Sequence, residues 1–131
     1  MNLFRAFFGG LRDAGLVALR DARFAHERGA QLLRANLTKE QLRQLHDVAY
    51  FEVVGGTSKT RYRIHDCSMI NVEQLDENNR PVCKWCFAPI GNLVRGDVLL
   101  AQKLALELFE TEALVCANGY PTYSHDLHVR P

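Results

Sequence analysis

The chain has 131 residues, is 47% hydrophobic and carries 16 Lys and Arg against 15 Asp and Glu, for a net charge of +1. This length predicts one domain, and this composition is that of a soluble globular protein, which buries enough apolar surface to fold without disulfides. The small net charge excludes an overall field that draws the chain onto nucleic acid or an anionic membrane, and no apolar run approaches the ~20 residues that span a bilayer.

The first predicted element is a helix over residues 3–33. Large apolar residues share one face at its start, namely Leu3, Phe4, Phe7 and Phe8. Gly9-Gly10 interrupts this pattern and predicts a break or kink. Because apolar stripes mark interaction sites, we expect these residues to bind a protein partner or a second copy. An interfacial membrane helix is the alternative, but Asp13 and Asp21 dilute the basic face that such a helix needs.

A second, shorter helix is predicted from Lys39 to about Val48. Thr38 is a good N-cap for it, and Gln41 three residues later completes a capping box. This helix delivers the chain into the first strand.

Four strands are predicted next, over residues 50–54, 60–65, 69–75 and 82–87. Period-two alternation places one set of side chains on the buried face, namely Tyr62, Ile64, Ile70, Val72 and Trp85. The turns between the strands are too short for the crossover that a parallel pair requires. The sequence therefore predicts a four-stranded antiparallel meander.

One long helix is predicted from Val98 to about Ala117, with Asp97 as its N-cap and Asn118-Gly119 as its end. Its apolar residues spread over more than half of the circumference, which predicts that the helix lies across the sheet with Leu104 buried. The exposed face is expected to carry Gln102, Lys103, Glu107, Glu110 and Thr111.

Together these elements predict an α+β fold, in which a four-stranded antiparallel meander packs against a long C-terminal helix and is preceded by N-terminal helices. We expect a helical arm over residues 1–37, an α+β core over 38–118 and an extended tail over 119–131. The tail has no periodicity, but Tyr120 and Tyr123 are candidate anchors that assist assembly.

Several short motifs lie between Phe51 and about Asn118, namely Phe51-Glu52-Val53-Val54-Gly55, Arg61-Tyr62-Arg63-Ile64, Asn71-Val72, Cys86-Phe87, Gly96-Asp97 and Leu100 through Glu107. In these motifs the segment, which covers about half of the chain, resembles a small domain found in many bacterial and phage-associated proteins. That family carries no assigned activity. The resemblance therefore implies a domain boundary and brings no catalytic residues with it.

A candidate binding set is predicted on the outward face of the sheet, namely Arg61, Arg63, His65, Asn71 and Lys84. Two arginines spaced two apart on a strand stand side by side and can grip a phosphate or a carboxylate. Alternatively, these cations pair with Glu52 and Glu73 on neighbouring strands. Nucleic-acid binding would need more exposed aromatic residues and a more basic chain, so we do not expect it.

Two close pairs of soft ligands approximate a structural zinc spacing, namely His65, Cys67, Cys83 and Cys86. On a regular strand, however, Cys83 and Cys86 point to opposite faces. We therefore expect no metal and no other cofactor, with a zinc-stabilised domain as the alternative. Four cysteines at irregular spacing, without a recognisable secretory signal, are typical of a reducing compartment, which we take to be the cytoplasm.

The sequence offers weak signals for catalysis. Cys86 with His65, and Ser124-His125-Asp126 in the tail, have the residue types of hydrolases, but adjacent residues do not form a triad by themselves. We therefore predict that the protein is not an enzyme. The predicted function is binding or assembly, as an accessory or structural subunit that is phage-related. The alternative is a small zinc-stabilised binding domain, with nucleic acid as one partner.

Overall fold

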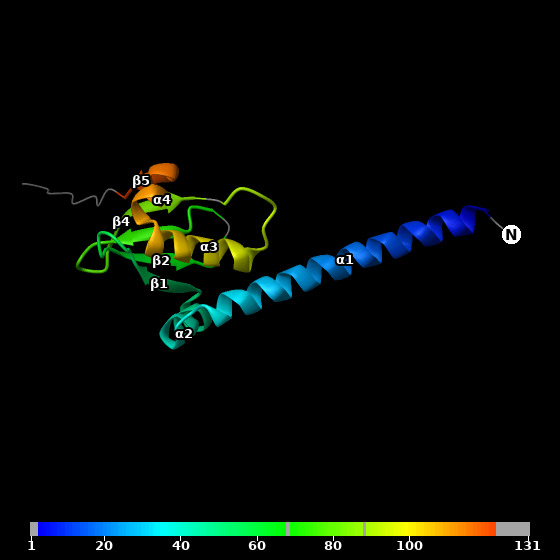
Figure 1. Ribbon diagram of the computed structural model, residues 1–131, viewed down its shortest axis with the longest axis horizontal. Helices are drawn as coiled ribbons and strands as arrows, with labels where there is room; N and C mark the ends of the chain where they lie inside the picture. Colours follow the sequence, from blue (N-terminus) through cyan, green and yellow to red (C-terminus); the bar gives the residue numbers. More distant parts are fainter. Residues whose placement is uncertain (1–2, 68, 88, 123–131) are drawn as a thin grey trace, which may run out of the picture.

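The computed structural model describes residues 3–67, 69–87 and 89–122, with side chains described from residue 16 onward. In chain order its elements are α1 Leu3–Ala35, α2 Lys39–Val48, β1 Tyr50–Val54, β2 Arg61–His65, β3 Val72–Leu75, β4 Pro81–Cys86, α3 Arg95–Leu108, α4 Glu110–Cys116 and β5 Asn118–Pro121. The arrangement confirms the α+β class, with a long N-terminal helix leading into an antiparallel sheet that is packed with helices (Figure 1).

The sheet is an antiparallel meander in which each strand pairs with the next, from β1 to β5. The four predicted strands are present, and β5 adds a fifth that the sequence assigns to a helix end and a tail. In β5, Gly119 pairs with Trp85 of β4. A Cβ on Gly119 would lie 2.8 Å from the Trp85 ring, so glycine permits this close approach. The predicted helix cap at Gly119 is wrong because the backbone here completes a ladder with β4.

The core lies between the sheet and the helices that cover it. Phe51, Tyr62, Ile64 and Val72 are at most 1% exposed, which confirms the inward side chains predicted for β2 and the inward position of Val72. Ile70 is the exception, since it is exposed and has a φ of 49°. It lies in the turn before β3, where strand alternation does not apply.

The predicted single C-terminal helix is in fact two helices, α3 and α4, separated at Phe109, whose φ of −136° and ψ of 41° are not helical. The loop between β1 and β2 meets the chain at this break. There the amide of Gly56 donates to the carbonyl of Leu106 at 3.0 Å. This bond comes from outside the helix and replaces the partner that the Leu106 carbonyl would have had in an unbroken helix.

The buried face of α3 also differs from the prediction. Leu104 is 40% exposed, whereas Gln102 and Lys103, which the sequence places on the exposed face, are 3% and 8% exposed. Both buried polar groups have partners, because Gln102 bonds to Asn71 and the Lys103 ammonium lies 2.6 Å from the Glu107 carboxylate. A hydrophobicity pattern does not reveal which residues become neighbours after folding. Hydrogen bonds and ion pairs with such neighbours offset the cost of burying polar groups.

The free edge of β1 is covered by α2. Thr38 and Gln41 form the predicted capping box at its start. Gln41 Nε2 also donates to the carbonyl of Glu52 at 2.8 Å, and Gln44 Oε1 accepts from the amide of Glu52 at 2.9 Å. An unpaired strand edge can form backbone hydrogen bonds with another chain. Here two side chains of α2 bond to the amide and the carbonyl of Glu52 instead.

The longest element is α1, a continuous helix of 33 residues, which corresponds to a length of about 50 Å. It does not break at Gly9-Gly10. Its C-terminal part packs against α3, and its first buried residue among the described side chains is Gly29. The preceding part projects away from the body of the molecule (Figure 1).

Candidate functional site

Four of the five predicted binding residues lie together on the face of the sheet opposite the core. Strand register places Glu52, Arg63, Glu73 and Lys84 side by side across the sheet. Arg63 Nε lies 3.0 Å from Glu52 Oε1, and Lys84 Nζ lies 3.6 Å from Glu73 Oε1. This row therefore alternates acid and base, as cross-strand neighbours commonly do.

Arg61 and His65 share this outer face and also have acidic neighbours. His65 Nε2 lies 2.8 Å from Glu73 Oε2, and Arg61 Nη1 lies 3.7 Å from Glu52 Oε2. Arg61 bonds in addition to the side chain of Asn79. An anionic ligand on this face would have to compete with carboxylates that are already in place.

Asn71 does not lie on the outer face, and its place in the predicted set is wrong. It is 4% exposed and exchanges two hydrogen bonds with Gln102, of 2.8 and 2.9 Å. Gln102 also donates to the carbonyl of Phe87 at 3.0 Å. The left-handed backbone of Ile70 interrupts the alternation, so the next side chain points inward. Asn71 therefore ties the β2–β3 turn to α3.

The candidate zinc ligands of the alternative prediction do not converge on one point. Cys83 pairs with Gln74 on the core side of β4, and Cys86, three residues further along the strand, lies on the opposite side. Cys67 is exposed after β2. Within the described ranges, no three His, Cys, Asp or Glu side chains are placed to hold a metal ion. The arrangement that the spacing of His65, Cys67, Cys83 and Cys86 allows is therefore not formed.

Most of the predicted assembly residues fall outside the described side chains. Leu3, Phe4, Phe7 and Phe8 lie in α1 before its first described side chain, and Tyr123 lies outside the described residues, as do Ser124, His125 and Asp126. Tyr120 is described. It lies on β5, pairs with Lys84 and is 48% exposed.

The described part of α1 exposes large apolar side chains. Leu16, Val17, Leu19, Phe24 and Leu32 are 51% to 64% exposed. Every residue from 16 to 28 is exposed. This part of α1 is thus an apolar surface without a covering element among the described residues.

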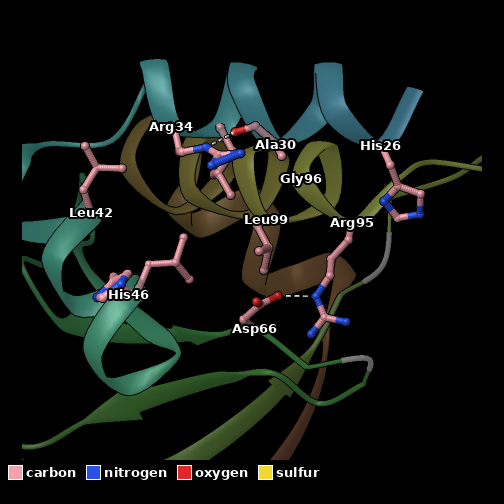
Figure 2. Close-up of a pocket in the computed structure, with 11 residues that line it drawn as sticks. His26, Ala30, Arg34, Leu42, His46, Asp66, Arg95, Gly96 and Leu99 are labelled. Carbon is pink, nitrogen blue, oxygen red and sulfur yellow. Dashed lines mark hydrogen bonds and ion pairs between the residues drawn. The ribbon is translucent and has the colours of Figure 1, made fainter. Parts of the chain in front are cut away.

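A hollow of about 470 Å³ lies where α1, α2 and α3 meet (Figure 2). Its floor is apolar and consists of Leu33, Leu42, Leu45 and Leu99, with Ala30 and Gly96 beside them. Its rim carries ionisable side chains, namely His26, Arg34, His46, Asp66 and Arg95. Sequence reasoning missed this site because its leucines come from three separate helices and each resembles an ordinary core residue.

Glu110 is another group that sequence reasoning misplaced, since it is predicted exposed and is 3% exposed. Its Oε1 accepts from the Tyr62 hydroxyl at 2.7 Å and from the Ser58 hydroxyl, and its Oε2 accepts from the amides of Thr57 and Ser58 at 2.8 and 2.7 Å. Burial raises the pKa of this carboxyl, but the hydrogen bonds, led by those from Ser58, outweigh it and lower the pKa to about 2.

The hydrogen bonds of this buried cluster connect a loop, a strand and a helix. Burial, followed by the nearby Glu110 carboxylate, raises the pKa of Tyr62, so its hydroxyl stays protonated and keeps donating. Both oxygens of Glu110 are engaged and its pKa lies far from neutral, which makes it a poor general base. The carboxylate instead fastens the β1–β2 loop and β2 to the start of α4.

Among the described residues, no helix is both long enough and apolar enough to cross a bilayer. In comparisons with known proteins, no family model, no curated protein and no solved structure matches this chain.

Proposed function

We propose that this protein is a non-enzymatic assembly protein that binds a second copy of itself through α1. The proposal is carried by one observation: every residue of α1 from 16 to 28 is exposed, and its first buried residues among the described side chains are Gly29 and Leu33. A helix in a protein gains most of its stability by packing an apolar face. The projecting part therefore needs a covering surface.

One face of α1 is suited to this packing. Gly29 packs against α3, and counting back by three or four residues gives Ala25, Ala22 and Ala18, which share the same helical face. In the sequence, the same spacing continues through Leu11, Phe8, Phe7 and Phe4. Small residues let two helices approach closely, and the interaxial distance depends on the side chains at the contact. We call the positions 18, 22 and 25 the alanine stripe.

The charges on the projecting part favour a second copy as the partner. It carries both signs, namely Arg20, Arg23 and Arg28 with Asp21 and Glu27. In an antiparallel pair of identical helices, basic positions of one copy can lie near acidic positions of the other. A two-fold pair also uses the same surface on both copies, so the alanine stripe of one copy would pack against the alanine stripe of the other.

We further infer an accessory or structural role in a phage-related assembly, supported by the resemblance of residues 51–118 to a phage-associated domain. The free state of all four cysteines supports a reducing compartment such as the cytoplasm. A zinc-stabilised domain that binds nucleic acid has less support, because its four ligands do not converge and the outer-face cations have acidic partners.

The test is the oligomeric state of the full chain. Sedimentation velocity over a range of concentrations should show a concentration-dependent dimer. Ala18→Glu combined with Ala22→Glu places charges in the middle of the alanine stripe and should shift the chain to monomer, because a buried unpaired charge is strongly unfavourable. A wild-type chain that sediments as a monomer at all concentrations would overturn the proposal.

Val17→Glu combined with Gln31→Glu is the matched control. Val17 is 56% exposed and lies roughly 140° around the helix from Ala22; Gln31 is exposed and lies roughly 180° from Ala22. The control makes the same change of two charge units, so dimerisation should persist. If it dissociates the dimer as strongly as the stripe variant does, net charge rather than the stripe governs association, and the assignment of this face fails.

A further inference from the structure

We propose that the hollow between α1, α2 and α3 binds a small amphiphile, an aliphatic chain that ends in a carboxylate or a phosphate. Its volume of about 470 Å³ is within the range of small-molecule sites. The proposal is independent of self-association, since it rests on a different surface and different residues.

The floor of the hollow supplies an apolar surface that is already formed. Leu33 and Leu99 are 4% and 3% exposed and belong to the core, and Leu42 and Leu45 pack against that core from α2. The close contact of α1 with α3 and the docking of α2 on β1 fix these side chains in place. A preformed floor lowers the ordering cost of binding.

The rim supplies one cation without an acidic partner. Arg34 Nε donates to the carbonyl of Ala30 at 3.2 Å, which holds its guanidinium at the rim (Figure 2). In the part of the chain that the structure describes, no acidic side chain forms an ion pair with Arg34. Arg95, by contrast, is paired with Asp66. Arg34 is therefore the group placed to bind an anionic head.

His26 and His46 also border the hollow. The Nδ1 atom of His46 lies 2.9 Å from the carboxylate of Asp47, so one of its two ring nitrogens already has a partner. His26, from α1, lies at the end of the hollow near Arg95 (Figure 2). Both imidazoles can donate to an anion without adding a negative charge to the rim.

The apolar floor and Arg34 together favour an amphiphile over other classes of ligand. A neutral apolar molecule fills the floor but leaves Arg34 without a partner, and a small anion gains the charge contact without the floor. A chain with one anionic head uses both. Hydrogen bonds to a charged group contribute about 1.5–3 kcal/mol, so the head group should improve the affinity by at least about tenfold.

Titration calorimetry on the full chain tests this with three ten-carbon probes, decanoate, decyl phosphate and decanol, with the two anions below their micelle-forming concentrations and decanol below its solubility limit. We expect saturable binding of at least one of the two anions, and which of them binds more tightly identifies the head group. Decanol should bind at least about tenfold more weakly. No saturable binding of either anion, or equal binding of decanol, would overturn the proposal.

Variants locate the site. Arg34→Gln should weaken binding of the anion by about tenfold or more, and Ala30→Leu should weaken it by filling the hollow. Arg43→Gln is the control, because Arg43 is 68% exposed, pairs with Glu40 and does not line the hollow. Amide chemical shifts of Ala30, Leu42 and His46 in the wild-type chain provide a readout that needs no variant. Binding that leaves these shifts unmoved and survives both variants lies elsewhere.

Discussion

Gly29 of α1 and Gly96 of α3 meet backbone to backbone. A Cβ on Gly96 would clash with the carbonyl of Gly29 and would lie 2.8 Å from the amide nitrogen of Ala30. A Cβ on Gly29 would instead meet the side chains of Val94 and Asp97, at 2.5 and 3.2 Å. The crossing of the two helices is therefore closest at Gly96, where only backbone can be displaced.

This asymmetry predicts different effects for two identical substitutions. Gly96→Ala should lower the free energy of unfolding by roughly 1–3 kcal/mol, because overpacking against backbone forces the helices apart. Gly29→Ala should cost less than Gly96→Ala, because its clash is with side chains and Val94 can change rotamer, and because alanine is favoured over glycine in a helix by about 1 kcal/mol. Urea denaturation of both variants measures the difference. Equal stability of Gly96→Ala and the wild type would show that the helices do not cross here.

Glu110 predicts a defined dependence of stability on pH. Its pKa is lowered from 4.5 to about 2 in the folded chain, so the folded state binds its proton less readily than the unfolded state does. The resulting stability is fully present above pH 4.5 and is lost as the pH falls toward 2. Its size is roughly 3 kcal/mol from the shift of the pKa. The advantage of wild type over Glu110→Gln, measured by urea denaturation at pH 6 and pH 3, should therefore shrink at the lower pH.

Tyr62→Phe provides the control for this interpretation. It removes one donor to the Glu110 carboxylate and keeps the ring that fills the core, so the pKa of Glu110 should rise and the pH dependence should weaken. The free energy of unfolding near neutral pH should fall by roughly 1.5–3 kcal/mol, the range for hydrogen bonds to charged groups. An unchanged pH dependence in both variants would mean that Glu110 does not hold the β1–β2 loop.

Two leucines on α3 distinguish the observed burial from the pattern expected from hydrophobicity. Leu106 is fully buried and Leu104 is 40% exposed. Leu106→Ala should therefore lower the stability by roughly 2–5 kcal/mol, while Leu104→Ala should remove less than about 1 kcal/mol, as exposed substitutions usually do. Thermal or urea unfolding of the two variants gives the comparison. A reversed order would mean that α3 is rotated about its axis.

The sequence predicts those parts of the fold that depend on local pattern. The alternation around Tyr62 and Ile64 and the capping box at Thr38 are both present. The prediction places polar residues of α3 and α4 on the exposed face, and it is wrong at both helices for the same reason. Gln102 and Glu110 are buried because partners distant in sequence, Asn71 for one and the β1–β2 loop for the other, satisfy them. Hydropathy records the cost of burying such groups and contains no information about the partners.

Several glycines occupy positions where packing leaves no room for a Cβ, which the sequence alone does not reveal. Gly55 and Gly56 mark the β1–β2 loop as a turn, but their packing explains the choice of residue: a Cβ on Gly55 would clash with the Glu110 carboxylate, and one on Gly56 with the carbonyl of Glu107. Gly119 likewise lies against Trp85. The hollow between α1, α2 and α3 was also beyond local reasoning, because its lining exists only after three helices have packed.

The final prediction concerns the N-terminal end of α1. A chain that starts at Asp13 lacks Phe4, Phe7 and Phe8 but keeps Gly29 and all described buried residues. Burial of each large apolar side chain contributes roughly 1.5–3 kcal/mol, so truncation should weaken self-association by at least about tenfold. The body should unfold at nearly the same temperature, because its core begins at Gly29. Sedimentation and thermal unfolding of the full and shortened chains test both expectations. If both chains are monomers of equal stability, the apolar positions near the N-terminus do not mediate assembly.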